Sequence, residues 1–209
     1  EEVAEFITGA DVVGARSAVS AIGRMGVKLP ENNGQVAEQL LKFLEVDIEH
    51  VSAEAILSMK NLMRKFPEAI ERFIGAIGAL MRVTEEPEAK VALLWMVGEF
   101  GHVIPEAPYL LEPLIDAFEE EQSQEVQLQL LATCAKLFFR RPAEIQRMLG
   151  RLLDAAIADA SYTDVHDRAM LYYRLLLGPT QRAEQILTKS AVVVGAFVEE
   201  VESELQDKI

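Results

Sequence analysis

The sequence predicts an all-α protein, a solenoid of about five helix hairpins. The first observation behind this prediction is a proline period. Five of the eight prolines lie 37, 38, 37 and 37 residues apart, and each follows an apolar run at helical spacing: Pro30, Pro67, Pro105, Pro142 and Pro179. Self-similarity with a period of roughly 20–50 residues is typical of repeat proteins, so each period is expected to be one supersecondary unit.

The second observation is that side chains stay in register with these prolines. Three columns counted from the prolines hold only apolar residues: Ile22, Met59, Val97, Cys134 and Leu171 eight residues before; Val36, Phe73, Leu111 and Met148 six after; Leu40, Ile77, Ile115 and Leu152 ten after. A period of this length falls near the range of HEAT and armadillo repeats. In the fifth unit the two downstream columns hold Gln185 and Lys189, so the array is expected to change or end there.

The central unit, Ala89–Phe118, shows the expected hairpin most clearly. Its first half is apolar on nearly every face, which predicts a helix covered on more than one side. Pro105 stops that helix, and Pro108 opens a second one, expected to run through Phe118 with a narrower apolar stripe. Each hairpin is therefore expected to pair an inner helix, before its proline, with an outer helix after it.

The other elements follow the same alternation. Glu1–Ile7 is expected to be the tail of an outer helix from a preceding repeat, and Ser123 is expected to cap the fourth inner helix. The remaining helices are predicted over Val12–Lys28, Gln35–Val46, Glu49–Phe66, Pro67–Val83, Ser123–Arg141, Ile145–Ile157, Thr163–Leu177 and Thr180–Leu187. We therefore divide the chain into a repeat array over 1–188 and a non-repeat segment over 189–209.

Charge and composition exclude several classes of partner. The 209 residues carry a formal net charge of −14, which argues against nucleic acid as a partner. No cluster of lysine and arginine suits an anionic membrane surface, so membrane association is expected only peripherally and through other chains. The single cysteine forms no internal disulfide, which fits a cytoplasmic location. The sequence opens in acidic, helix-like residues, as a piece of a longer protein would.

No residue pattern points to catalysis, to a cofactor or to a metal. Cys134 falls in an apolar column and is interpreted as a core residue rather than a nucleophile. His50, His102 and His166 are isolated near helix ends, without the spacing of a metal site. The acidic runs Glu119–Glu121 and Glu199–Glu200 are interpreted as solvated surface. Gly98 and Gly101 are interpreted as sites of close helix packing, and Phe43–Asp47, which faintly resembles a clathrin-box peptide, lies on a predicted helix. The sequence therefore predicts no catalytic residue, no cofactor-binding residue and no metal-binding residue.

Asp167 and Arg168 are the polar residues that depart most from the repeat pattern. They stand twelve and eleven residues before Pro179, where the two preceding units carry Leu93-Leu94 and Leu130-Leu131. A charge in a core position must be paired or hydrogen-bonded. We expect both side chains to be largely buried and to bridge repeats; contact with a partner protein is the alternative.

Four ordered segments resemble the beta-adaptins, the large subunits of heterotetrameric clathrin-adaptor-type complexes: AVSAIGRMGVKL at Ala18–Leu29, PEAKVALLWMVGEFG at Pro87–Gly101, EVQLQLLATCAKLFFRRPAE at Glu125–Glu144 and DRAMLYYRLLL at Asp167–Leu177. The resemblance covers roughly residues 5–188 and places the chain in the C-terminal half of an adaptin trunk. PEAPYLLEPLID and MLGRLL lean toward the fourth, trans-Golgi adaptor type.

The resemblance implies a non-catalytic scaffold segment of a vesicle-coat adaptor. Its implied partners are a second large subunit and the medium and small subunits of the complex. Its implied location is cytoplasmic and peripheral on trans-Golgi or endosomal membranes. Another HEAT-repeat scaffold, such as a transport receptor or a phosphatase scaffold, is the alternative within binding proteins. An enzyme built on a helical array is the alternative of another class.

Overall fold

The structure is a computed structural model that describes residues 11–46, 48–158 and 161–188. Within these ranges the chain forms ten α-helices and no strand. The helices are α2 (Val12–Lys28), α3 (Asn33–Leu44), α4 (Glu49–Lys65), α5 (Ile70–Val83), α6 (Pro87–Phe100), α7 (Ala107–Asp116), α8 (Gln124–Arg140), α9 (Pro142–Ala158), α10 (Thr163–Leu177) and α11 (Thr180–Leu187). The predicted helix over Glu1–Ile7 and the segment from residue 189 onward lie outside the described residues.

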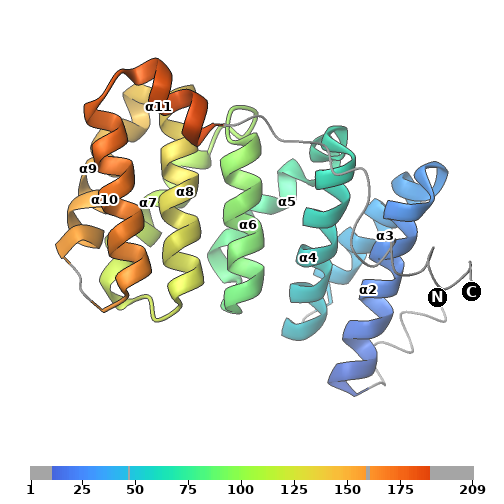
Figure 1. The fold of residues 1–209 in the computed structure, drawn as a ribbon. Helices are drawn as coiled ribbons and strands as arrows, with labels where there is room; N and C mark the ends of the chain where they lie inside the picture. The colour runs from blue at the N-terminus through green and yellow to red at the C-terminus, as the bar shows by residue number, and fades with distance from the viewer. Residues whose placement is uncertain (1–10, 47, 159–160, 189–209) are drawn as a thin grey trace, which may run out of the picture.

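The helices stand in two layers, which confirms the predicted solenoid. The inner layer holds α2, α4, α6, α8 and α10, each packed against the next (Figure 1). The outer layer holds α3, α5, α7 and α9, again in chain order. The two layers are joined by contacts between helices that follow one another in the chain: α2 with α3, α3 with α4, α5 with α6, α7 with α8, α8 with α9 and α9 with α10. The repeating unit is therefore one inner helix with one outer helix.

Prolines and caps set the helix ends, with small departures from the prediction. Pro30 and Pro67 each open a single 3₁₀ turn, η1 (Pro30–Asn32) and η2 (Pro67–Ala69), and the outer helix begins only after that turn. The second helix of the central unit ends at Asp116 rather than Phe118, after the internal Pro113, whose ring nitrogen has no hydrogen to donate. Ser123 caps α8 as predicted, because its side chain accepts a hydrogen bond from the Val126 amide.

The apolar columns form the core. All residues of the two downstream columns in the first four units are buried, and Met59, Val97 and Cys134 of the upstream column are fully buried. Eight residues of α6 are buried, so the central helix is covered on more than one side, as its sequence predicts. Burial of this kind stabilises a solenoid at every junction between neighbouring units, since each unit covers an apolar face of the next.

Gly98 is a point of close approach between α6 and α8. A β-carbon at this position would lie 3.2 Å from Thr133 Oγ1 and 3.3 Å from Thr133 Cα. Thr133 is fully buried, and its hydroxyl donates a 2.8 Å hydrogen bond to the Leu94 carbonyl in the middle of α6. The absence of a side chain at Gly98 therefore lets the two helices approach closely enough for this bond.

We expect Gly98→Leu to destabilise the chain by about 1–3 kcal/mol, because the added side chain overpacks the α6–α8 contact. The matched control is Gly150→Leu on α9, where an added β-carbon would meet nothing within 4 Å. There the replacement of glycine within a helix is expected to stabilise by roughly 0.5–1 kcal/mol. Urea denaturation followed by circular dichroism measures both changes, and shifts of the same sign in the two variants would contradict the close-approach interpretation.

The fifth hairpin departs from the others. α11 packs against α10 and α8, across the end of the inner layer in Figure 1, instead of continuing the outer layer beside α9. Only Ala183 of α11 is buried, and Gln185, where the apolar column fails, is exposed. Leu171, which continues the upstream column, is 51 % exposed. The predicted change of the array at this unit is confirmed.

No helix in the described part of the chain is long and apolar enough to cross a membrane.

Candidate interaction surface

Cys134 is a core residue. Its side chain is fully buried in the hydrophobic core, and burial raises the pKa of its thiol to about 12. A thiol with so high a pKa holds almost no thiolate at neutral pH, and the thiolate is the nucleophilic form. The structure therefore places Cys134 where it packs as a small apolar side chain, as its sequence position predicts.

The three histidines lie far apart, each in a helix-end region. His50 is in the first turn of α4, His102 follows the last turn of α6, and His166 is in the first turn of α10, where its Nδ1 lies 3.1 Å from the Ile157 carbonyl oxygen. Across the described ranges no group of three or more histidine, cysteine, aspartate or glutamate side chains is placed to hold a metal ion.

The acidic run Glu119–Glu121 is only partly solvated surface. Glu119 and Glu120 are exposed, but Glu121 is half-buried and supports the start of α8. Its carboxylate accepts a 2.9 Å hydrogen bond from the Ser123 amide and lies 3.6 Å from Lys90 Nζ. The prediction of solvated surface is therefore wrong for Glu121, because Lys90 approaches it from α6, an element that the sequence alone does not place beside it. Glu199 and Glu200 lie outside the described residues.

The prediction that Asp167 and Arg168 are buried is wrong. Both side chains are exposed, and neither makes a hydrogen bond or ion pair with the rest of the described structure. The leucines in the corresponding slots of α6 and α8 are buried because the next inner helix packs on them. α10 has no following inner helix among the described residues, so these slots face outward and charged side chains stay hydrated there.

Arg168→Ala is accordingly expected to change the free energy of unfolding by less than about 0.5 kcal/mol, as surface substitutions usually do. Arg147→Ala, which removes another exposed guanidinium, should have an equally small effect. Urea midpoints of the two variants and the unsubstituted chain measure this. A loss of more than about 2 kcal/mol for Arg168→Ala alone would show a buried partner for this residue.

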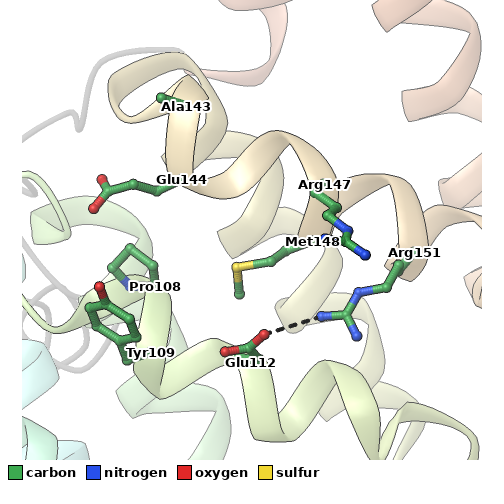
Figure 2. Close-up of a pocket in the computed structure, with 8 residues that line it drawn as sticks. All are labelled: Pro108, Tyr109, Glu112, Ala143, Glu144, Arg147, Met148 and Arg151. Carbon is green, nitrogen blue, oxygen red and sulfur yellow. Dashed lines mark ion pairs between the residues drawn. The ribbon is translucent and has the colours of Figure 1, made fainter.

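A groove of about 470 Å³ crosses the outer layer between α7 and α9. Figure 2 shows Met148 in its centre, with Pro108, Tyr109 and Glu112 on the α7 side and Glu144, Arg147 and Arg151 on the α9 side. Met148 is nearly buried, whereas the Tyr109 side chain is 71 % exposed. The groove thus presents an apolar floor between an exposed aromatic ring and a pair of arginines.

Most charges of this groove are already paired. Arg151 lies 2.6 Å from Asp116 Oδ1 and 3.5 Å from Glu112 Oε1, and it ties α9 to α7. Glu144 forms a bidentate ion pair with Arg141, which holds the pKa of the Glu144 carboxyl below its ordinary value. Arg147 has no such partner in the described structure. Exposed tyrosine and arginine are residue types enriched at protein–protein interfaces, so the groove is suited to contact another protein chain.

The second notable region is the junction where the end of α8 meets the end of α6. Arg140 and Arg141 look like basic residues placed to interact with the end of their own helix. In the structure their side chains instead donate hydrogen bonds to the end of α6 and to the turn after it. Arg140 donates to the Glu99 carbonyl, and Arg141 donates to the carbonyls of Ile104 (3.0 Å) and Pro105 (3.1 Å). They thus supply donors to the Glu99 carbonyl in the last turn of α6 and to two carbonyls of the turn that follows this helix.

His102 belongs to the same junction. Its Nδ1 lies 2.5 Å from Arg140 Nη1, and since a guanidinium only donates, Nδ1 accepts and the ring is neutral. His102 is exposed, but partial desolvation of the ring at the junction, and then the Arg140 charge, lower its pKa below the ordinary value. In the pH range between this lowered pKa and the ordinary value, the unfolded chain binds more protons than the folded chain.

We therefore expect acidification through that range to destabilise the protein through His102, with stability regained as the pH rises above about 6.5. Thermal unfolding at pH 7.5 and pH 5.5 measures the loss, and His102→Gln, which cannot titrate, should lose less stability than the unsubstituted chain. Equal losses in the two proteins would assign the pH dependence to other groups.

Packing also shows why the segment that resembles a clathrin-box peptide cannot act as one. Phe43 is almost completely buried in α3, so Phe43–Val46 is not available as an extended ligand for another protein. Asp47 lies outside the described residues.

Comparison with known proteins identifies the family of this array. Residues 1–179 match the family model of the adaptin N-terminal region. Beta-adaptin-like protein A of Arabidopsis thaliana is 38 % identical over 209 residues, which is all of this chain and 25 % of that protein. AP-1 complex subunit beta-1 of Homo sapiens is 33 % identical over 208 residues, 100 % of this chain and 22 % of the relative. AP-4 complex subunit beta-1 of Mus musculus is 33 % identical over 187 residues, 90 % of this chain and 25 % of the relative.

The chain thus spans about a quarter of the length of the curated relatives that it matches. The family match covers most of the chain, and the four segments that resemble beta-adaptins all begin within it. This protein belongs to the adaptin N-terminal-region family, and it resembles the beta-type large subunits within that family.

Proposed function

We propose that this chain is a non-catalytic scaffold segment of a vesicle-coat adaptor large subunit, and that it supports subunit assembly for cargo sorting in membrane traffic. The observation that carries the proposal is the pairing of a two-layered helical array with the exposed Tyr109–Arg147 groove on its outer layer. An array of this kind holds a contact surface in a constant shape, because neighbouring repeats fix one another. The relatives that it matches are named as subunits of complexes.

The proposed partners are the other adaptor subunits: a second large subunit and the medium and small subunits. Their contacts with this chain include the α7–α9 groove, and Asp167 and Arg168 become a second contact because both charges are exposed. The net charge of −14 opposes a role on nucleic acid. We infer that the protein is cytoplasmic and reaches trans-Golgi or endosomal membranes peripherally, through the assembled complex.

Two earlier expectations remain predictions. The division into an array over 1–188 and a non-repeat segment over 189–209 depends in part on residues outside the described ranges. The assignment to the fourth adaptor type also remains a prediction, because relatives of the first and of the fourth type are both 33 % identical to this chain.

Affinity purification of the tagged full-length protein from cytosol tests the proposal. We expect the other subunits of one adaptor complex to co-purify in equal amounts. Arg147→Glu should reduce their recovery several-fold, whereas Arg182→Glu, which reverses an exposed charge on α11, should not. Recovery of the full-length protein without other adaptor subunits would overturn the proposal.

Cell fractionation tests the location. The proposal requires a cytosolic pool and a membrane pool that high salt releases without detergent. A membrane pool that resists both salt and alkaline carbonate would contradict peripheral attachment.

A further inference from the structure

A second groove, of about 400 Å³, opens at the edge of the solenoid beside the second repeat, where this repeat joins the first and the third. It is formed where α3 turns into α4 and where α5 turns into α6. Aliphatic side chains from both turns line it: Leu44, Val46, Ile48, Leu80 and Val83. Val83 is 72 % exposed, more than any other large apolar residue that the structure describes. The groove is distinct from the α7–α9 groove and shares no residue with it.

The charged residues that line this groove all have the same sign. They are the glutamates Glu45, Glu49, Glu85 and Glu86, without a single lysine or arginine. Glu86 is already neutralised, since Arg16 of α2 contacts both of its oxygens at 2.6 and 2.7 Å. The side chains of Glu45, Glu49 and Glu85 are exposed, and none of them pairs with a cation elsewhere in the described residues.

The backbone does not offset this charge. The C-terminal ends of α3 and α5 border the groove with their negative dipole ends, while the N-terminal ends of α4 and α6 border it with their positive dipole ends. These contributions oppose one another, so the three unpaired carboxylates set the sign of the local potential. Focusing of a single sign of charge in a cleft raises the local concentration of oppositely charged ligands.

The walls of the groove are held by internal hydrogen bonds. The Ile48 amide donates to the Val46 carbonyl at 2.8 Å, the Ser52 hydroxyl donates to the same carbonyl at 3.4 Å, and the Thr84 amide donates to the Leu80 carbonyl at 3.0 Å. A surface that is ordered before binding loses less conformational entropy on association than a flexible one.

We propose that this groove is a docking site for a short segment of a partner protein in which lysine or arginine alternates with aliphatic residues. The aliphatic side chains of the segment would cover Val83 and its apolar neighbours, and its cations would pair with Glu45, Glu49 and Glu85. Burial of aliphatic surface supplies affinity, and the unpaired carboxylates select against acidic segments. The proposal does not depend on the proposed scaffold function, because the chemistry of the groove alone carries it.

Fluorescence anisotropy with a labelled peptide tests the proposal. The probe is an octapeptide of alternating lysine and leucine, and the protein is the 209-residue chain. We expect saturable binding at micromolar concentrations. A peptide with the leucines replaced by serine, and a peptide with the lysines replaced by glutamate, should each bind at least tenfold more weakly.

Charge-reversed variants locate the site. Glu45→Lys combined with Glu85→Lys is expected to weaken probe binding at least tenfold. Glu38→Lys combined with Glu71→Lys changes the net charge equally at two exposed positions outside the groove, and it should weaken binding less than twofold. Equal weakening by the two pairs would show nonspecific attraction to an acidic protein and would overturn the proposal.

A second pair of variants tests the apolar half of the site without affecting the core. Val83→Ser should weaken binding several-fold, whereas Val13→Ser, at a similarly exposed valine on α2, should not. Unchanged binding by Val83→Ser would overturn the proposal. It would also be overturned if analytical ultracentrifugation showed a dimer that Val83→Ser dissolves, since the occupant would then be a second copy of this chain.

Discussion

Arg141→Ala is expected to lower the free energy of unfolding by about 2–3 kcal/mol, although Arg141 is only half-buried and follows the last residue of α8. Its guanidinium donates to the carbonyls of Ile104 and Pro105 and, at 3.5 Å, to that of Gly101. Hydrogen bonds from a charged group are worth roughly 1.5–3 kcal/mol each in net terms, and the shared geometry makes their sum smaller than additive. Alanine would remove the arginine donor from all three carbonyls, and only that of Ile104 would keep another, the Ala107 amide at 3.2 Å.

Two comparisons make this expectation specific. Arg147→Ala removes the same side chain from an exposed position six residues after Arg141, and it should shift the urea midpoint little. Arg141→Lys keeps the charge but loses the planar fork that reaches several oxygens at once, so it should recover only part of the stability. Equal midpoints for Arg141→Ala and Arg147→Ala would mean that water replaces the arginine without cost.

Lys136→Ala is expected to cost about 3 kcal/mol, because it leaves a buried carboxylate without its partner. Glu99 of α6 has a side chain only 8 % exposed, and Lys136 of α8 pairs with it across the repeat boundary. Removal of one member of a buried ion pair typically costs about 3–5 kcal/mol, and the lower end applies here because the lysine is 25 % exposed.

The double variant Lys136→Met with Glu99→Met separates this effect from simple loss of packing. Replacement of both members of a buried pair by apolar side chains is often neutral, so the double variant should be more stable than Lys136→Ala alone. Urea denaturation of the single and double variants measures the difference. A double variant less stable than the single one would show that the pair itself stabilises the junction beyond relief of an unpaired charge.

Arg141→Ala and Lys136→Ala both weaken the junction between α6 and α8. In a quasi-one-dimensional array each interface couples only neighbouring units, so a weak junction lets the two parts unfold separately. Hydrogen exchange should therefore increase in α6 and α8 before it increases in α2 and α4 in either variant. This regional pattern distinguishes a weakened junction from a uniform loss of stability.

The repeat architecture could be predicted because its signals are local. A proline ends or delays a helix through its own ring, whatever surrounds it, and helical spacing of apolar residues specifies which face is buried. The bounds predicted for α2, α10 and α11 agree with the structure, and the three apolar columns are buried in the first four units apart from Ile22, which is half-buried against the core. The failure of the column at Gln185 likewise marks the unit whose second helix leaves the outer layer.

The error at Asp167 and Arg168 shows the limit of a column argument. A slot is buried only if another element covers it, and the sequence of one unit does not report whether a neighbouring inner helix follows in the same position. Leu93 and Leu130 are buried by the next inner helix, whereas Asp167 in the equivalent slot of α10 remains exposed. Equal spacing from a proline therefore predicts equal orientation on the helix but not equal environment.

What the sequence determined by itself was the alternation of helices, their inner and outer placement, the family and the acidic character of the chain. The tertiary structure alone decided which polar residues matter at the junctions and where the surface is hollowed. Arg141 contacts carbonyls 36 to 40 positions earlier, and the groove at Val83 joins turns that lie about one repeat apart. The physical reason is range: helix formation follows from spacings of three or four residues, whereas ion pairs and grooves depend on how whole repeats are placed against one another.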